Sequence, residues 1–338
     1  MKKILNVLLL ASLLLLTACG GGDKVATNEN NQANANTNAA AEKAETKDAY
    51  YPVTIETVDA QGNPVQETFE KEPERVVAVY QSAIENMLAL GLEDKMVLAA
   101  QLDIDVKDEY KDAFSKVEYV KDAPSKEAVL AAKPDFIISW ASYFGDKTLG
   151  DVKDWQDKGV NTYILKNSGA VKVDSLENEY DDILNLGKIF NKQKEAQAIV
   201  QSMKDRLAET EKLREGKEPV KAAILEIEDD NLFRNYGAKT VGGEIAEKAG
   251  AKLVMDEDRF GSEALLTKDP DVIFIVYFGE DKVKDQELDR FKSLPALKGL
   301  SAIKNDRVYP ISLSEVYASG VRTADGIDTM IKGLYPES

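Results

Sequence analysis

The chain has 338 residues with a formal net charge of −17 and contains no histidine. The absence of histidine excludes Ser-His-Asp and Cys-His catalytic groups, the HExxH zinc motif and histidine-based transition-metal sites. No lysine- or arginine-rich run and no glycine-rich phosphate loop is present, so the sequence predicts no binding of nucleic acid or nucleotides. The acidity favours a soluble monomer.

The first 18 residues have the pattern of a secretory signal peptide. Lys2 and Lys3 precede an apolar run over residues 4–16, which is shorter than the roughly 20 residues that span a membrane. The following LTAC resembles a bacterial lipobox, which implies cleavage before Cys19 and acylation of its thiol. Because Cys19 is the single cysteine, it cannot form an internal disulfide. We expect a lipid anchor on the outer face of the cytoplasmic membrane; the alternative is a soluble secreted protein.

For residues 19–49 we predict a lipidated cysteine followed by a disordered linker. This stretch is rich in Asn, Ala and Gly and has almost no large apolar residues, so it cannot bury enough surface to offset its ordering entropy. The body, residues 50–338, is long for one hydrophobic core and suits two lobes of ordinary domain size.

Apolar strands alternate with helical patterns through both halves of the body, which predicts an α/β fold with two Rossmann-like lobes. Each lobe is expected to be a parallel sheet flanked by helices. The expected strands of the N-lobe (about 73–172) are 75–80, 96–100, 135–140 and 161–166, with a helix from Ser82 to Leu90. In the C-lobe (about 220–338) strands are expected at 222–227, 271–278 and 307–312, with helices near 240–249 and 323–334.

One long helix, about 175–214, is expected to join the lobes. Asp174 and Glu177 form a capping-box-like start, and Gly216 and Pro219 end the pattern. A helix of some 39 residues reaches roughly 60 Å. Such a connector would hold the lobes stiffly and limit hinge closure.

A twelve-residue segment occurs twice. EAVLAAKPDFII (127–138) and EALLTKDPDVIF (263–274) align without a gap and are identical at six positions. Each predicts a short helix, a Pro-Asp break and a buried strand. We interpret this as duplication of the lobe; the alternative is chance likeness between two helix–strand units.

Taken in order, these features resemble a known family. The lipobox, the linker, PERVVAVY (73–80), the two repeated segments, the connecting helix and YASGVRTADGI (317–327) are similar to the siderophore, haem and cobalamin substrate-binding proteins of ABC importers. The resemblance covers about 73–338. It implies a class III substrate-binding fold, no enzymatic activity, a metal chelate held in a shallow cleft, and delivery to a permease and its ATPase.

Glu127 and Glu263 begin the two repeated helices and match the glutamates with which the family docks on arginines of the permease. A helix that precedes a parallel strand starts at the carboxyl edge of the sheet, where ligands bind in such folds, so both should be exposed beside the cleft. The alternative is that glutamate simply suits the first turn of a helix. Glu85 is a weaker candidate for the same rim.

Side chains that follow strand ends are expected to line the cleft. Aromatic side chains offer flat surface to a large chelate, and arginine offers fixed donors to its anionic oxygens. Arg322 also matches the arginine of the family in this last loop. The expected ligand-binding residues are Tyr80, Trp140, Tyr143, Arg234, Tyr236, Tyr277, Tyr317 and Arg322.

Within the family, a ferric siderophore is the expected ligand, with haem or cobalamin as alternatives. Because a chelator fills the coordination sphere of the metal, we expect no metal ligand from the protein and no cofactor. A different class, a secreted lipoprotein hydrolase, would use carboxylates such as Asp103, Asp105 or those of residues 226–230, which are otherwise solvated loop charges. A bare-metal-binding lipoprotein would need histidines, and an adhesin would show β repeats or low complexity in its body.

Overall fold

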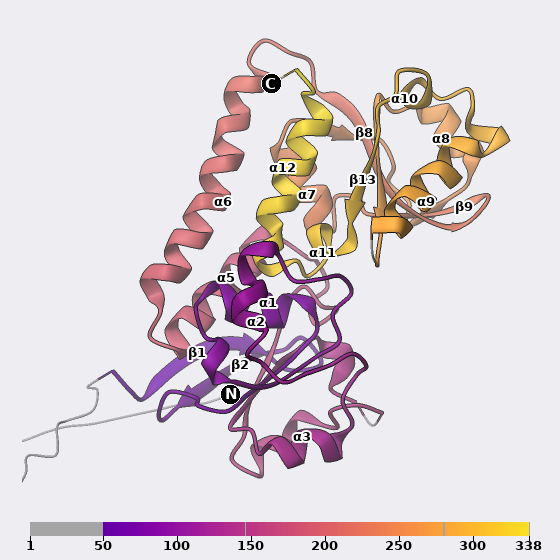
Figure 1. Cartoon of the computed structure of the whole chain (residues 1–338). Coiled ribbons are helices and arrows are strands. Elements are labelled where there is room, and N and C mark those ends of the chain that lie inside the picture. Colours follow the sequence, from indigo (N-terminus) through magenta and orange to yellow (C-terminus); the bar gives the residue numbers. More distant parts are fainter. Residues whose placement is uncertain (1–49, 146, 280, 338) are drawn as a thin grey trace, which may run out of the picture. The chain divides into compact units, whose positions relative to one another are not determined.

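A computed structural model describes residues 50–337 apart from residues 146 and 280. The predicted signal peptide, Cys19 and the linker therefore lie outside the described residues. Within the described part of the chain, no helix is both long and apolar enough to cross a membrane. The described residues form two α/β lobes, as predicted, and Figure 1 shows α6 (Gln193–Arg214) running along one side of the body.

The sheet of the N-lobe is wholly parallel and confirms the strands expected from the sequence. Its order is β5-β4-β3-β6-β7. The strands are β3 (Val76–Val79), β4 (Met96–Ala100), β5 (Tyr119–Val120), β6 (Phe136–Ser139) and β7 (Asn161–Ile164). The helices of this lobe are α1 (Gln81–Ala89), α2 (Lys111–Phe114), α3 (Lys126–Ala132) and α4 (Val152–Gln156). Every residue of β3 and β6 is buried, as expected for central strands covered on both faces.

An antiparallel hairpin that the sequence reasoning missed precedes this sheet. It consists of β1 (Val53–Val58) and β2 (Pro64–Phe69). The Glu67 carboxylate accepts hydrogen bonds from the backbone N–H of Thr162, at 2.9 Å, and from the Asn161 amide, at 3.0 Å. These bonds fasten the hairpin to the edge strand β7, whose backbone groups would otherwise be open to pairing.

The sheet of the C-lobe is mixed, so the expectation of a parallel sheet holds only for part of it. Its order is β11-β9-β8-β12-β13, and β10 also pairs with β8. Its strands are β8 (Val220–Asp229), β9 (Leu232–Asn235), β10 (Ala251–Leu253), β11 (Arg259–Phe260), β12 (Val272–Tyr277) and β13 (Val308–Ser312). Its helices are α7 (Val241–Lys248), α8 (Ser262–Lys268), α9 (Asp281–Ser293), α10 (Ser301–Lys304), α11 (Leu313–Val316) and α12 (Thr323–Leu334).

The antiparallel part of this sheet arises because β8 is longer than expected. It continues to Asp229 and turns through residues 230–231 into β9. The acidic stretch at 226–230 is therefore the end of a strand and a hairpin turn, and Asp230-Asn231 is a turn signal in the sequence.

The repeated segment has the same structural role in each lobe. Asp135 accepts a hydrogen bond through its carboxylate from the backbone N–H of Arg75, at 2.8 Å, and its own N–H donates to the Arg75 carbonyl. Asp271 makes the equivalent pair of bonds with the backbone of Lys221, its carboxylate accepting at 3.0 Å. In each lobe this bond ties the repeated strand, β6 or β12, to its neighbour, β3 or β8.

The prediction of one continuous connecting helix is wrong. Two helices, α5 (Leu176–Ile189) and α6, meet at a break at residues 190–192, and Ser175 rather than Asp174 caps the first of them. Asn191 has a left-handed backbone, with φ of 53°. The N–H of Lys192 donates to the Gly187 carbonyl at 2.6 Å, which completes a Schellman turn. A side chain at Gly187 would come within 2.5 Å of Ala196, so glycine permits the close crossing of the two helices.

Replacing Asn191 with alanine should lower the free energy of unfolding by about 1 kcal/mol, because alanine tolerates the left-handed conformation less well than asparagine. Asn191→Gly should leave the stability unchanged or raise it. Urea denaturation followed by circular dichroism measures both variants. Equal stabilities for the alanine and glycine variants would contradict the role of this residue in ending α5.

Candidate functional site

Four of the expected ligand-binding aromatics come together in one cluster between the lobes. The ring centroids of Tyr80 and Trp140 are 3.7 Å apart, and Tyr143 lies 5.8 Å from Tyr80. Tyr317, from the C-lobe, approaches Trp140 edge-on at 5.4 Å. The Trp140 indole N–H also donates to the Ser82 hydroxyl at 3.1 Å. Packed in this way, the rings leave no room for a water molecule between them.

Tyr80 holds an unusual backbone conformation at the end of β3. Its φ of 85° and ψ of 159° lie in a region that is nearly restricted to glycine and costs about 1–3 kcal/mol. Its hydroxyl donates to the Asp103 carboxylate, and burial together with that negative charge raises the pKa of Tyr80. Burial also raises the pKa of Asp103, although the bond from Tyr80 opposes the shift. Strain of this kind is concentrated at binding sites, which supports placing the site at this strand end.

Arg234 and Tyr236 form a second group on the C-lobe, close enough to the aromatic cluster for the charge of Arg234 to oppose the rise in the pKa of Tyr317. The Tyr236 hydroxyl donates to Glu226 at 2.8 Å, and the Arg234 guanidinium lies 5.0 Å from the Tyr236 ring centroid. Tyr236 is only 1 % exposed, so its ring packs in the core instead of lining an open surface. Arg234 is partly exposed and lies 3.8 Å from the Glu226 carboxylate.

The open space between the lobes lies beside the aromatic cluster. A cavity of about 680 Å³ and an adjoining one of about 490 Å³ share residues 104–106, Lys111, Gly279 and Lys282. We refer to the two together as the interlobe cavity. Of the residues expected from the sequence, Tyr277 and Arg322 line it. The sequence reasoning missed its N-lobe wall, residues 102–108, although this loop follows the carboxyl end of β4.

Cationic side chains are concentrated around the interlobe cavity, although the chain as a whole is acidic. The cationic side chains are Lys107, Lys111, Lys121, Lys282 and Arg322, and they face the cavity together with Asp103, Asp105 and Asp108. Three of them already have a carboxylate partner: Lys107 pairs with Asp325, Lys111 with Asp108 and Arg322 with Glu85. Apolar surface comes from Leu102, Phe114 and Tyr119. Such a mixture suits an anionic ligand with apolar parts.

A second hollow, of about 720 Å³, lies among α5, α6 and α7. Its lining residues are on helices, and it is remote from the carboxyl ends of the strands, where ligands bind in parallel α/β sheets. We therefore place the site in the interlobe cavity.

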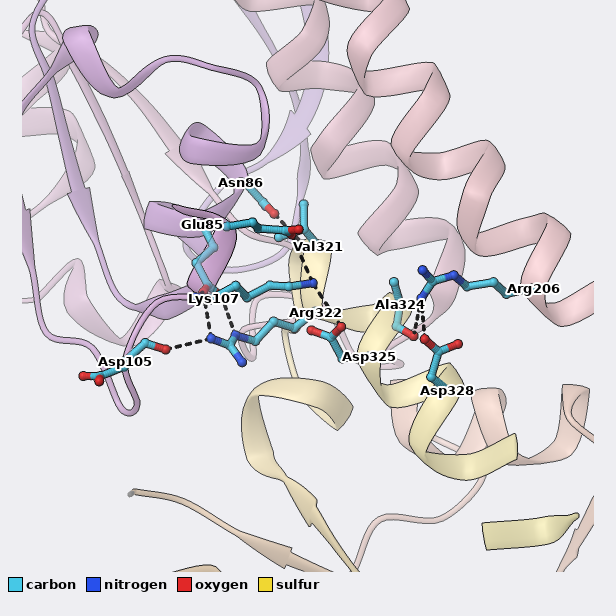
Figure 2. Close-up of polar contacts among 11 residues, drawn as sticks. Glu85, Asn86, Asp105, Lys107, Arg206, Val321, Arg322, Ala324, Asp325 and Asp328 are labelled. Atoms are coloured by element: carbon cyan, nitrogen blue, oxygen red, sulfur yellow. Dashed lines mark hydrogen bonds and ion pairs between the residues drawn. The ribbon is translucent and has the colours of Figure 1, made fainter. Parts of the chain in front are cut away.

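Arg322 crosses between the lobes and forms a buried ion pair with Glu85 (Figure 2). Its Nε and Nη2 atoms donate to the two Glu85 oxygens at 2.5 and 2.8 Å, and Nη2 also donates to the Asp105 carbonyl at 2.8 Å. The placement of Glu85 on an exposed rim is wrong, because this side chain is 0 % exposed. The apolar spacing of α1 predicts that its polar face, which carries Glu85, is exposed to solvent. In the structure the helical turn 320–322 of the C-lobe packs on that face and buries it.

Two further side chains hold the same turn. Asn86 accepts a hydrogen bond from the backbone N–H of Val321, at 2.9 Å. Glu179, on α5, accepts from the N–H groups of Ser319 and Gly320 at 3.0 and 2.6 Å, and burial raises the pKa of Glu179. We call residues 319–322 with Glu85, Asn86 and Glu179 the interlobe latch.

Both candidate docking glutamates are exposed at the first turn of their helices, Glu127 on α3 and Glu263 on α8. Ser125 caps α3 by accepting from the backbone N–H of Ala128 at 3.3 Å. Their exposure agrees with the expectation, whereas their position beside the cleft and docking itself stay predictions.

The two lobes, the cavity at their strand ends and the connecting helices define a bilobal solute-binding protein. The family described as periplasmic binding protein matches residues 76–312. The chain therefore belongs to that family, as the resemblance predicted, and the family consists of solute-binding proteins and not enzymes.

Individual relatives support this assignment over most of the body. The ABC transporter substrate-binding lipoprotein YvrC of Bacillus subtilis (strain 168) is 26 % identical over 303 residues, 88 % of this chain and 90 % of YvrC. The Fe(3+)-citrate-binding protein YfmC of the same organism is 25 % identical over 256 residues, 70 % of this chain and 72 % of YfmC. The crystal structure of a periplasmic binding protein from Veillonella parvula DSM 2008 is 35 % identical, with a TM-score of 0.79, and covers 85 % of this chain and 92 % of its own.

Glu85→Gln should lower the free energy of unfolding by about 3 kcal/mol, because it leaves the buried Arg322 without its counter-ion. Asp325→Asn is the matched control. It removes one of the two carboxylate partners of Lys107, at 3.0 Å in a more exposed pair, leaves Glu109 at 3.5 Å, and should cost less than about 1 kcal/mol. Chemical denaturation measures both. Similar small losses for the two variants would contradict the stabilising role of the buried pair.

Glu315, on α11, makes stability depend on pH. Burial raises its pKa to about 7, so the folded protein holds a proton that the unfolded chain releases near pH 4.5. Unfolding free energy should therefore fall as pH rises between about 4.5 and about 7, and Glu315→Gln should lose this part of the slope. Asp174, whose pKa burial also raises to about 7, adds a similar slope to both proteins. Denaturation across this pH range tests the difference; identical slopes would refute it.

Proposed function

We propose that this chain is an extracytoplasmic, lipid-anchored solute-binding protein that captures an iron(III) chelate and delivers it to the permease and ATPase of an ABC importer. The observation that carries the proposal is the interlobe cavity, which lies at the strand ends of a member of the periplasmic binding protein family and is lined by five cationic side chains and three aspartates. Acylation of Cys19 would supply the anchor. The similarity to YvrC, which is named a lipoprotein, supports that part.

A ferric chelate, such as a siderophore, is the ligand that the cavity fits best. Many chelates of iron(III) carry carboxylate or hydroxamate oxygens, which lysine and arginine bind through charge-assisted hydrogen bonds. The similarity to YfmC, which is named for ferric citrate, supports an iron chelate over the alternatives, haem and cobalamin. Since the chelator already surrounds the metal, no side chain of the protein has to coordinate it.

Delivery requires contact with a membrane partner, and we propose that Glu127 and Glu263 make it. Both carboxylates are exposed, and each lobe presents one at the start of the repeated helix. Basic side chains of the permease would pair with them.

Binding can be followed through Trp140, which is partly exposed in the aromatic cluster. Trp155 is 1 % exposed and its indole N–H donates to the Leu149 carbonyl, so a Trp155→Phe variant isolates the signal of Trp140. We expect saturable quenching by ferric citrate or a ferric hydroxamate. In the same background, Lys111→Gln should weaken binding by up to roughly tenfold, the value of one charge-assisted contact, because Lys111 gives up part of its ion pair with Asp108 to reach the ligand.

Lys153→Gln is the control for this measurement, because Lys153 is exposed on α4 and pairs with Asp157 outside the cavity. It should bind as tightly as the parent. If only haem or only cyanocobalamin quenches the fluorescence, that compound is the ligand and the proposal of a non-haem iron chelate is wrong. If none of these four ligands binds, or if Lys111→Gln has no effect, the proposed ligand or its site is wrong.

A further inference from the structure

Two exposed leucines occupy the same position in the two lobes. Leu130 on α3 and Leu266 on α8 have 42 % and 37 % of their surface exposed. Each follows a candidate docking glutamate, Glu127 or Glu263, by three residues. Figure 1 shows α3 and α8 in different lobes and both remote from α6.

The fold explains only half of the identities in the repeated segment. The identical proline is buried in both copies, the identical aspartate binds the neighbouring strand, and the identical isoleucine is buried. The other three identities, Glu, Ala and Leu, belong to the helix, where Ala264 packs against the core and the one position buried in both copies is not among the identities. The buried position itself differs, being Val129 in α3 and Leu265 in α8. Packing therefore does not account for keeping leucine at the exposed position twice.

Glutamate and leucine three residues apart lie on the same side of a helix, with their Cβ atoms about 5–6 Å apart. Each lobe thus presents a carboxylate next to an apolar side chain. Both helices are also held at their ends, since each terminates in a left-handed residue, Lys133 or Asp269. The two surfaces are therefore preformed and similar.

The carboxylates of these surfaces are available to a partner. Within the described part of the chain, neither Glu127 nor Glu263 has an ion pair within 4.0 Å. A second copy of this acidic chain would bring like charges together at these surfaces, whereas a basic membrane partner would be attracted. Charge complementarity therefore favours, over a second copy, the permease, whose basic side chains the proposed function pairs with these glutamates.

We infer that Leu130 and Leu266 are docking contacts, each inserting into an apolar depression beside a basic residue on the permease, which presents this surface once to each lobe. The inference rests on the proposed function and extends it, because it adds an apolar contact to each glutamate. The glutamates would orient the encounter, and the leucines would bury apolar surface and slow dissociation.

The test is the binding of the mature chain to the permease–ATPase complex of its importer in lipid nanodiscs, measured by surface plasmon resonance without ligand. Leu130→Gln and Leu266→Gln keep a side chain that favours helix and remove the apolar contact. Each should weaken binding about tenfold, mainly through faster dissociation, and the double variant should weaken it more than either. Leu232→Gln is the control, because Leu232 is 39 % exposed on β9, outside the repeat, and should bind normally.

The results separate this inference from the proposed function. If the parent binds the permease and the double variant binds equally well, the leucine contacts are refuted while delivery stands. If the parent does not bind the permease at all, both are overturned. If the double variant instead abolishes self-association of the parent in sedimentation, the leucines cover a second copy and the inference is wrong. Unchanged quenching by ferric citrate and unchanged thermal unfolding in the variants must accompany the expected loss.

Discussion

The arrangement of the two lobes depends on the buried ion pair between Glu85 and Arg322. Burying two charges costs free energy unless their geometry is good and their remaining polar atoms are bonded. Here the pair is bidentate and Arg322 also donates to the Asp105 carbonyl. The same turn is held by Asn86 and Glu179 through backbone N–H groups. The interlobe latch therefore joins residues that lie between 140 and 237 positions apart in the chain.

This latch and the ligand site share one residue, Arg322. Arg322 both pairs with Glu85 and lines the interlobe cavity, and the loop that it anchors carries Tyr317 against Trp140. Separating the lobes would expose the charges of the latch and open the aromatic cluster. Resistance to lobe separation thus comes from buried polar bonds between the lobes, whereas the two connecting helices meet at a break and do not form one stiff rod.

Sequence patterns predicted the central strands and the repeated helix–strand units well. Runs such as 136–138 and 272–278 are continuously apolar, and a strand buried on both faces suits that composition at that length. The Pro-Asp break located both repeats, and the structure adds the reason for the aspartate, which binds the neighbouring strand at Arg75 or Lys221. The break at Asn191 was missed because the apolar spacing continues across it.

Other features of the site could not be inferred from local pattern. Glu85 lies on the polar face of α1. That face is buried only because the turn 320–322, from the C-terminal part of the chain, packs on it. The aromatic cluster was predicted residue by residue, yet its side chains pack on one another, and the open space lies beside them along residues 102–108.

The sequence by itself determined the lobes, the repeat, the family and the exposure of Glu127 and Glu263, since each depends on local composition or on spacing along one helix or strand. Only the tertiary structure decided which charged side chains are buried and where the cavity opens. Those properties depend on contacts between parts of the chain that are distant in sequence. The residues next to a side chain in the sequence do not indicate which distant element will pack against it.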